Sequence, residues 1–201
     1  MGARTQEQRK AETRARLIAA AADLFARKGF HAVSAEAVAD AADRTTGALY
    51  SHFGGKDGLL LALVEQWLEE SAARILVGVE EAADLDGRLR ALWREFTAPH
   101  EEHGDAWILL EFELWLHAVR DPVVAARLAE RYAAYRRQLA EPVEAWVRDE
   151  GIGPLLDPER SAADVIALLL GFAMQQRIDP IAITDDTVVT GLRAVIAGGS
   201  S

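Results

Sequence analysis

Residues 45–60, "TTGALYSHFGGKDGLL", gather side chains that can form hydrogen bonds with an external partner. Threonine, serine and tyrosine hydroxyls both donate and accept hydrogen bonds, whereas the ammonium group of Lys56 only donates them. Before the closing leucine pair the stretch contains only three large apolar residues, Leu49, Tyr50 and Phe53. A helix packed inside a small domain carries a wider apolar stripe. One face of this segment is therefore expected to serve a partner outside the protein.

Other chemistry has little support in the sequence. The run "GGKD" at residues 54–57 lacks the leading glycine and the following serine or threonine of a phosphate-binding loop. His100 and His103 stand three residues apart between Pro99 and Gly104, and no third metal ligand is indicated. No serine, histidine and acid lie in the strand-turn-helix context of a hydrolase, and the chain has no cysteine. We therefore expect no enzyme activity, no metal and no cofactor.

The elements that must position residues 45–60 are helices. Thr5 and Gln8 have the spacing of a capping box, Gly29 can end the first helix, and Ser34 and Thr45 can cap two short ones. Helices are expected at residues 6–28, 35–41, 46–53, from 57 through the following leucines, and at 85–97, 105–119, 122–149 with a kink at Pro142, 158–177 and 185–197. No alternating strand pattern occurs, so the expected fold class is all-α.

Two short helices joined by a tight turn and backed by a longer helix form a helix-turn-helix unit, whose second short helix lies in the DNA major groove. Leu49 and Phe53, four residues apart, then face inward, and the other side chains of this helix point outward or sideways. The residues expected to contact DNA are Thr45, Thr46, Gly47, Ala48, Tyr50, Ser51, His52 and Lys56. Among these, Tyr50, His52 and Lys56 can reach phosphates, whereas Thr46 is best placed to read base edges.

The charge distribution agrees with an anion-binding N-terminal part. The net charge is −10, yet residues 1–56 hold nine Lys and Arg against six Asp and Glu, and the remainder holds 13 against 26. A head of net charge +3 thus precedes a body of net charge −13. Arg4, Arg9, Lys10 and Arg14 form either a basic arm for the DNA backbone or a solvated charged end.

Residues 38–60, "VADAADRTTGALYSHFGGKDGLL", resemble the signature of the TetR family of transcriptional regulators. The matching residues are Val38, Ala39, Ala42, Thr45, Gly47, Leu49, Tyr50, His52, Phe53, Lys56 and Asp57. With the upstream helices the resemblance covers roughly residues 17–63. Asp43 stands where the family has a turn glycine, and Asp tolerates the left-handed conformation better than most residues. Arg44 replaces a buried apolar residue, so it either loosens the turn or contributes a phosphate contact.

The resemblance implies a DNA-binding domain at residues 1–56 and a ligand-sensing and dimerisation domain at residues 57–201. It further implies a dimeric regulator, expected to be a repressor of a palindromic operator that a small apolar effector releases. The family's second domain encloses an apolar cavity, and the residues expected to line it here are Trp67, Trp93, Trp107, Glu111, Trp115 and Phe172. No run of 18 apolar residues occurs, so a soluble cytoplasmic protein is expected.

The last two long helices are the expected dimer interface. Residues Val165–Phe172 are apolar nearly all round their helix, which is typical of a helix buried on several sides. Together with Val188–Ile196 they would form a four-helix bundle with a second copy, as in the TetR family. Two alternatives stay open: a regulator without a ligand, and a helical enzyme or carrier with a degenerate N-terminal domain. The enzyme or carrier alternative is disfavoured because the sequence shows no group of catalytic residues.

Overall fold

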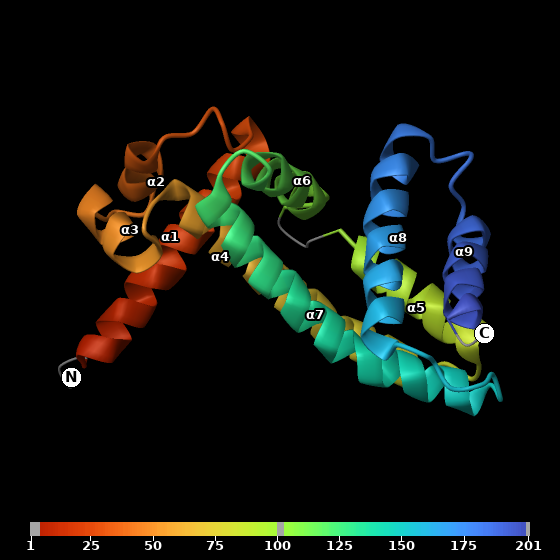
Figure 1. Ribbon diagram of the computed structural model, residues 1–201. Coiled ribbons are helices and arrows are strands. Elements are labelled where there is room, and N and C mark those ends of the chain that lie inside the picture. The colour runs from red at the N-terminus through yellow and green to blue at the C-terminus, as the bar shows by residue number, and fades with distance from the viewer. Residues whose placement is uncertain (1–4, 100–102, 200–201) are drawn as a thin grey trace. The chain divides into compact units, whose positions relative to one another are not determined.

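The computed structural model describes residues 5–99 and 103–199, and its secondary structure elements are helices (Figure 1). They are α1 (Gln6–Lys28), α2 (Ala35–Ala41), α3 (Thr46–Phe53), α4 (Lys56–Glu80), α5 (Leu85–Thr97), α6 (Ala106–Ala118), α7 (Pro122–Asp149), α8 (Pro158–Ile178) and α9 (Asp185–Gly198). The predicted all-α fold class is confirmed. Within the described residues, none of these helices is long and apolar enough to span a bilayer.

The chain packs as two compact units. Unit 1 comprises Met1–Glu69 and Pro99–Leu128, and unit 2 comprises Glu70–Ala98 and Ala129–Ser201. Packing therefore groups α6 with the first three helices. The functional boundary expected after Lys56 from the sequence stays a prediction, because packing alone does not decide which residues act on DNA.

The N-terminal helices of unit 1 begin at the predicted capping residues. The Thr5 amide donates to Gln8 Oε1 (2.9 Å) and the Gln8 amide donates to Thr5 Oγ1 (3.2 Å), which completes the capping box of α1. Ser34 Oγ accepts from the amide of residue 37 (3.1 Å), and Thr45 Oγ1 accepts from the amide of residue 48 (3.2 Å). These bonds satisfy amides that have no partner within their helices. The predicted starts of α1, α2 and α3 are thereby confirmed.

The core formed by the first three helices of unit 1 is built from a few large apolar side chains. Phe25 of α1, Val38 of α2 and Leu49 of α3 are buried, and the Phe25 ring packs edge-on against Phe30 with centroids 5.3 Å apart. Burial of each such side chain stabilises the fold by about 1.5–3 kcal/mol. This core fixes α3 from its inner side and leaves the opposite side for solvent.

The start of α4 approaches the end of α3 closely. A Cβ atom at Gly58 would lie 1.9 Å from the carbonyl oxygen of Phe53. No side chain larger than hydrogen fits there without moving the backbone. Gly58 therefore helps to set the position of α3 within unit 1.

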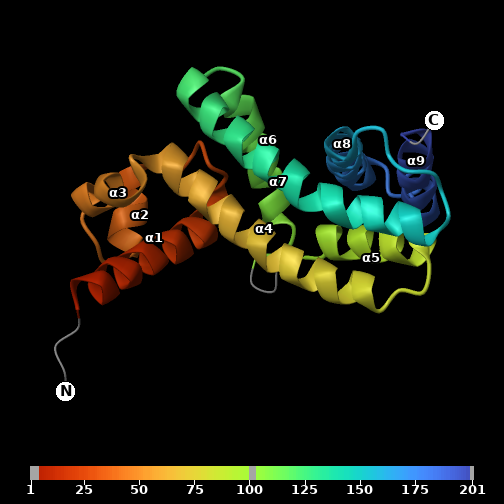
Figure 2. The same cartoon turned by 60° about the horizontal axis from the view of Figure 1, so that its bottom comes forward.

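In unit 2 the helices α5, α8 and α9 lie side by side (Figures 1 and 2). Trp93 of α5 donates its indole N–H to Asp185 Oδ1 at the start of α9 (2.9 Å). A Cβ atom at Gly191 of α9 would lie 3.1 Å from the ring of Phe172 of α8, so this glycine lets the two helices approach closely. The helix α7 runs through Pro142, and the kink expected at this residue stays a prediction.

Candidate nucleic-acid interface

The helix α3 presents one apolar and one polar face. Leu49 and Phe53 are buried, whereas Tyr50 is 55% exposed and Ser51 is also exposed. Thr45 and Gly47 are exposed, and Thr46, Ala48 and His52 are partly exposed. Seven of the eight residues expected to contact DNA thus lie on or beside α3 with surface open to solvent. Their outward face offers hydroxyls and small groups, which are suited to base edges and thymine methyls.

The turn between α2 and α3 is tight despite its unusual residue. Asp43 adopts a left-handed conformation with φ of 54°, as expected for a residue that replaces the family's glycine. The Asp43 amide donates to the carbonyl of Asp40 (3.0 Å), and the Arg44 amide donates to that of Ala39 (2.9 Å). These bonds close the end of α2. The turn expected from the sequence therefore forms.

Arg44 is held against α1. Its Nε donates to Thr13 Oγ1 (3.3 Å), its Nη1 donates to the Asp43 carbonyl (2.6 Å), and its Nη2 lies 3.7 Å from Glu12 Oε1. The side chain is about one-fifth exposed. The guanidinium thus replaces the apolar contact of the family's turn by polar contacts between the turn and α1, and a phosphate contact stays a prediction.

Lys56 lies differently from the other predicted DNA contacts. Its ammonium group donates to the carbonyls of Phe30 (2.9 Å) and Val33 (2.8 Å) and lies 4.1 Å from the centre of the Phe30 ring. Two of its three N–H groups are therefore used inside unit 1, in the loop between α1 and α2. The sequence could not reveal these acceptors, because they are backbone groups more than 20 residues away. A phosphate contact of Lys56 stays a prediction.

The surface of α1 carries further basic groups. Arg9, Lys10 and Arg14 are exposed, and the Arg14 guanidinium carbon lies 5.4 Å from the centre of the Phe53 ring at the end of α3. Arg4, the first residue of the expected basic arm, lies outside the described residues. On α2, hydrogen bonds from its own amide and from Ser34 lower the pKa of the exposed Glu36, so this carboxylate stays negative and repels phosphates.

The residues expected to bind an effector are divided between the two units. Unit 1 contains Trp67, Trp107, Glu111 and Trp115, whereas unit 2 contains Trp93 and Phe172. In unit 1, the indole N–H of Trp115 donates to Glu111 Oε1 (3.0 Å), and the Trp67 ring lies tilted by 38° against His103 with ring centres 5.5 Å apart. His100, the first residue of the His100 and His103 pair, lies outside the described residues.

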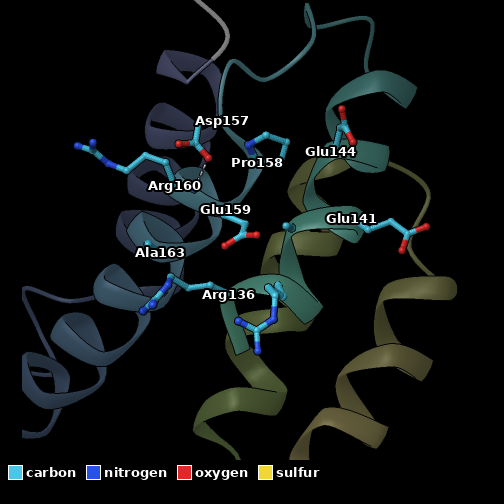
Figure 3. A pocket seen from close by; sticks show the side chains of 10 residues that line it. Arg136, Glu141, Glu144, Asp157, Pro158, Glu159, Arg160 and Ala163 are labelled. Carbon is cyan, nitrogen blue, oxygen red and sulfur yellow. Dashed lines mark hydrogen bonds between the residues drawn. The ribbon is translucent and has the colours of Figure 1, made fainter. Parts of the chain in front are cut away.

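Trp93 and Phe172 serve the packing of unit 2. The Trp93 indole is bonded to Asp185 and the Phe172 ring lies on Gly191, so both fill helix contacts. Unit 2 also contains an open pocket of about 810 Å³ between α7 and the start of α8 (Figure 3). Its lining is charged and includes Arg136, Arg137, Glu141, Glu144, Glu159 and Arg160. None of the six residues expected to bind an effector lines this pocket.

Two family models match the chain. Residues 17–63 match the model described as "Bacterial regulatory proteins, tetR family", which are the residues that carried the resemblance in the sequence. Residues 86–199, more than half of the chain, match the model described as "BetI-type transcriptional repressor, C-terminal".

Individual regulators are similar along most of the chain. The HTH-type transcriptional regulator UidR of Escherichia coli K12 is 25% identical over 186 residues, which are 92% of each chain. The HTH-type transcriptional activator FasR of Mycolicibacterium smegmatis is 31% identical over 117 residues, 58% of this chain and 52% of FasR. The structure of Salmonella enterica GusR is 26% identical with a TM-score of 0.68 and matches 98% of this chain and 97% of GusR. The chain therefore belongs to the TetR family and is a DNA-binding transcriptional regulator.

Proposed function

We propose that this regulator is a homodimeric repressor of a palindromic operator, which it leaves when a small apolar effector binds it. The outward face of α3 carries the proposal. Hydroxyls of Thr46, Tyr50 and Ser51 stand on a helix whose inner side is anchored by Leu49 and Phe53. A helix of this kind enters the major groove as a rigid body, so its side chains meet base edges in a fixed register.

The residues of α3 divide into two roles. Thr46, at the start of the helix, reads base edges, and the small residues Gly47 and Ala48 allow the helix to come close. Tyr50 and His52 contact phosphates and fix the register without reading sequence. Thr45 and Ser51 extend the polar face on either side of these residues.

The proposed dimer uses the outward faces of α8 and α9. Most large residues of Val165–Phe172 and Val188–Ile196, including Leu169 with 3% exposure, are buried within the subunit itself. The surface left for a second copy is therefore the opposite side of each helix. Small or apolar residues make up most of its middle, namely Ala163, Ala167, Gly171, Met174 and Ile178 on α8 and Thr190, Ala194 and Ala197 on α9, whereas the charged Arg160 and Asp164 stand at the start of α8. Small residues let helices of two subunits approach closely, which favours a tightly packed bundle.

A symmetric dimer sets the form of the operator. Two α3 helices related by a two-fold axis contact half-sites about 34 Å apart, one turn of DNA, so the operator is a palindrome. An effector that binds best to a conformation with another spacing then weakens operator binding by its differential affinity. The description of the C-terminal family model as that of a repressor supports repression, although FasR carries the name of an activator.

The effector site is proposed in unit 1. Trp107 and Trp67 are buried, and Trp115 is bonded to the buried carboxylate of Glu111. Indole rings offer large apolar surfaces, and a carboxylate held among them can orient a polar group of a ligand. Trp93 and Phe172 are left out of this proposal because their surfaces are used in the packing of unit 2.

The experiment that tests DNA binding compares two duplexes at two salt concentrations. The full chain is titrated with the DNA upstream of its own gene and with a scrambled duplex of the same length, at about 50 and 200 mM salt. We expect tighter binding of the upstream duplex at both concentrations and a loss of affinity of roughly 10³-fold or more between them, because several phosphate contacts release counterions. Equal affinity for the two duplexes would contradict the proposal.

A further inference from the structure

The peptide at Phe30 is held by two charged side chains from other helices. Phe30 follows α1 in the loop to α2, and its amide donates to Glu113 Oε2 of α6 (2.9 Å). Its carbonyl accepts from Lys56 Nζ of α4 (2.9 Å). One residue of the loop thus has its donor bonded to an anion and its acceptor bonded to a cation.

These bonds are partly buried. The Phe30 side chain is only 2% exposed and packs on Phe25, while the Lys56 ammonium lies over its ring. Hydrogen bonds to charged groups are stronger than bonds between neutral groups. The folded state is destabilised when a buried amide loses its acceptor. We therefore expect removal of the Glu113 carboxylate to loosen the loop at Phe30.

The loop leads directly into the two helices of the helix-turn-helix. Lys56 also binds the carbonyl of Val33, and the next residue, Ser34, is the N-cap of α2. The helix α2 in turn packs against α3. The position of the Phe30 peptide hence sets where α2 begins and, through α2, how α3 is presented.

We infer that Glu113 is a positioning residue for operator recognition, although it lies on α6 and is 83 residues from Phe30 in the sequence. The inference rests on the proposed binding of an operator by α3. The carboxylate of Glu113 holds the Phe30 peptide in the position that orients α2 and α3 for DNA. Without it, only a fraction of the molecules presents α3 correctly, and the apparent operator affinity falls by that fraction.

The test uses the full chain with Glu113 replaced by Ala, Gln or Asp. Alanine removes the acceptor, glutamine keeps an acceptor oxygen without charge, and aspartate keeps the charge but is one methylene shorter. The same three changes at Glu69, an exposed residue of α4 in the same unit, control for the altered net charge. Each variant is titrated with the tightest duplex selected by the unmodified protein and with a scrambled duplex, and thermal unfolding is recorded in parallel.

We expect Glu113→Ala to bind the selected duplex about tenfold more weakly at temperatures where it is fully folded. Binding to the scrambled duplex should change by less than about twofold, since it depends on total charge near the phosphates. Glu113→Gln should stay within about threefold of the unmodified protein, because its amide oxygen accepts the same N–H. Hydrogen exchange of the Phe30 amide should be faster in Glu113→Ala and nearly unchanged in Glu113→Gln.

The possible failures can be told apart. If the unmodified protein is selective and Glu113→Ala keeps the same selectivity, Glu113 only stabilises the fold and the inference is overturned. A similar loss at Glu69 would overturn it as well, since the effect would then be one of net charge. If Glu113→Ala does not fold, Glu113→Asp decides: retained selectivity overturns the inference, and reduced selectivity supports it. Absence of selective binding by the unmodified protein would instead contradict the proposed function and, with it, this inference.

Discussion

The exposed faces of α3 and α8 differ in chemistry, although both helices bury their other face in their own unit. On α3, the surface residues Thr46, Tyr50 and Ser51 carry hydroxyls. On α8, the outward residues are mostly small or apolar, namely Ala163, Ala167, Gly171, Met174 and Ile178. Hydroxyls gain little from burial in an apolar contact but can bond to bases and phosphates. Small apolar groups gain from burial in an apolar contact and form no hydrogen bonds with DNA, so they suit contact with a second protein surface.

Because the two faces differ in chemistry, DNA binding by α3 and dimerisation through α8 can be tested by separate substitutions. A substitution on α3 that weakens DNA binding should leave the dimer surface of α8 intact. A substitution on α8 that weakens the dimer should leave the outward face of α3 intact. Substitutions that harm the folding of either unit form a third group. The following changes are chosen to keep these three groups apart.

The largest effect is expected for Ala167→Glu on the outward face of α8. An unpaired carboxylate placed in an apolar interface destabilises the dimer by about 3–5 kcal/mol. The variant should be monomeric by light scattering while keeping its helical circular dichroism. Ala126→Glu, at an exposed position of α7, is the matched control and should remain dimeric. A dimeric Ala167→Glu would place the interface elsewhere.

Gly58→Ala should destabilise unit 1 by about 3 kcal/mol, since the new methyl group overlaps the end of α3. The conflict is with a backbone carbonyl, 1.9 Å from the added carbon, so no side-chain rotation relieves it. Urea unfolding measures the loss, and operator affinity should fall with it. Unchanged stability and affinity would mean that α3 and α4 separate readily and that Gly58 does not position the recognition helix.

Gly47→Ala is the counterpart of the previous change on the outer side of the same unit. At this position an added carbon meets only Thr45 Oγ1 at 3.8 Å, so the fold accepts it. Stability should rise by about 0.5–1 kcal/mol from the better helix propensity of alanine. Operator affinity should fall about tenfold, or about 1.4 kcal/mol, because the helix can no longer approach DNA as closely. Retained affinity would show that the helix start does not touch the groove.

The smallest effect is expected for Asp43→Gly in the turn before α3. Asp43 has a φ of 54°, which glycine adopts without strain, so the free energy of unfolding should rise by about 0.5 kcal/mol. Asp40→Gly, in the regular part of α2, should instead lower it. Thermal unfolding distinguishes the two. A destabilised Asp43→Gly would indicate that the contacts of this carboxylate outweigh the relief of strain.

The sequence was sufficient where the structure depends on neighbours along the chain. The caps at Thr5, Ser34 and Thr45 bond to amides three residues away, and the Leu49 and Phe53 pair repeats at helical spacing. Such local patterns predicted the starts of α1, α2 and α3 and the polar face of α3.

It was not sufficient where a contact joins distant segments. The sequence predicts a phosphate contact for Lys56 but does not indicate its bonds to the carbonyls of Phe30 and Val33. These bonds depend on the course of the loop between α1 and α2, which the spacing of apolar residues does not reveal. Glu113 was overlooked, although a second carboxylate in the apolar helix "AWILLEFELWLHA" indicated a buried or bonded acid. The close approach of the Phe172 ring to Gly191 on the next helix is likewise not visible in the sequence, and a place for Phe172 in a ligand cavity stays a prediction.

Base reading by α3 is tested by selecting high-affinity duplexes from a random pool with the unmodified protein and with Thr46→Val. Valine keeps the shape of threonine and removes its hydroxyl, so a bond to a base edge is lost at about 1–3 kcal/mol. We expect the unmodified protein to select a palindrome and Thr46→Val to relax the preference at one position in each half-site, with scrambled DNA bound as before. Selection of the same sequence with the same stringency by both proteins would contradict base reading by Thr46 at the start of α3.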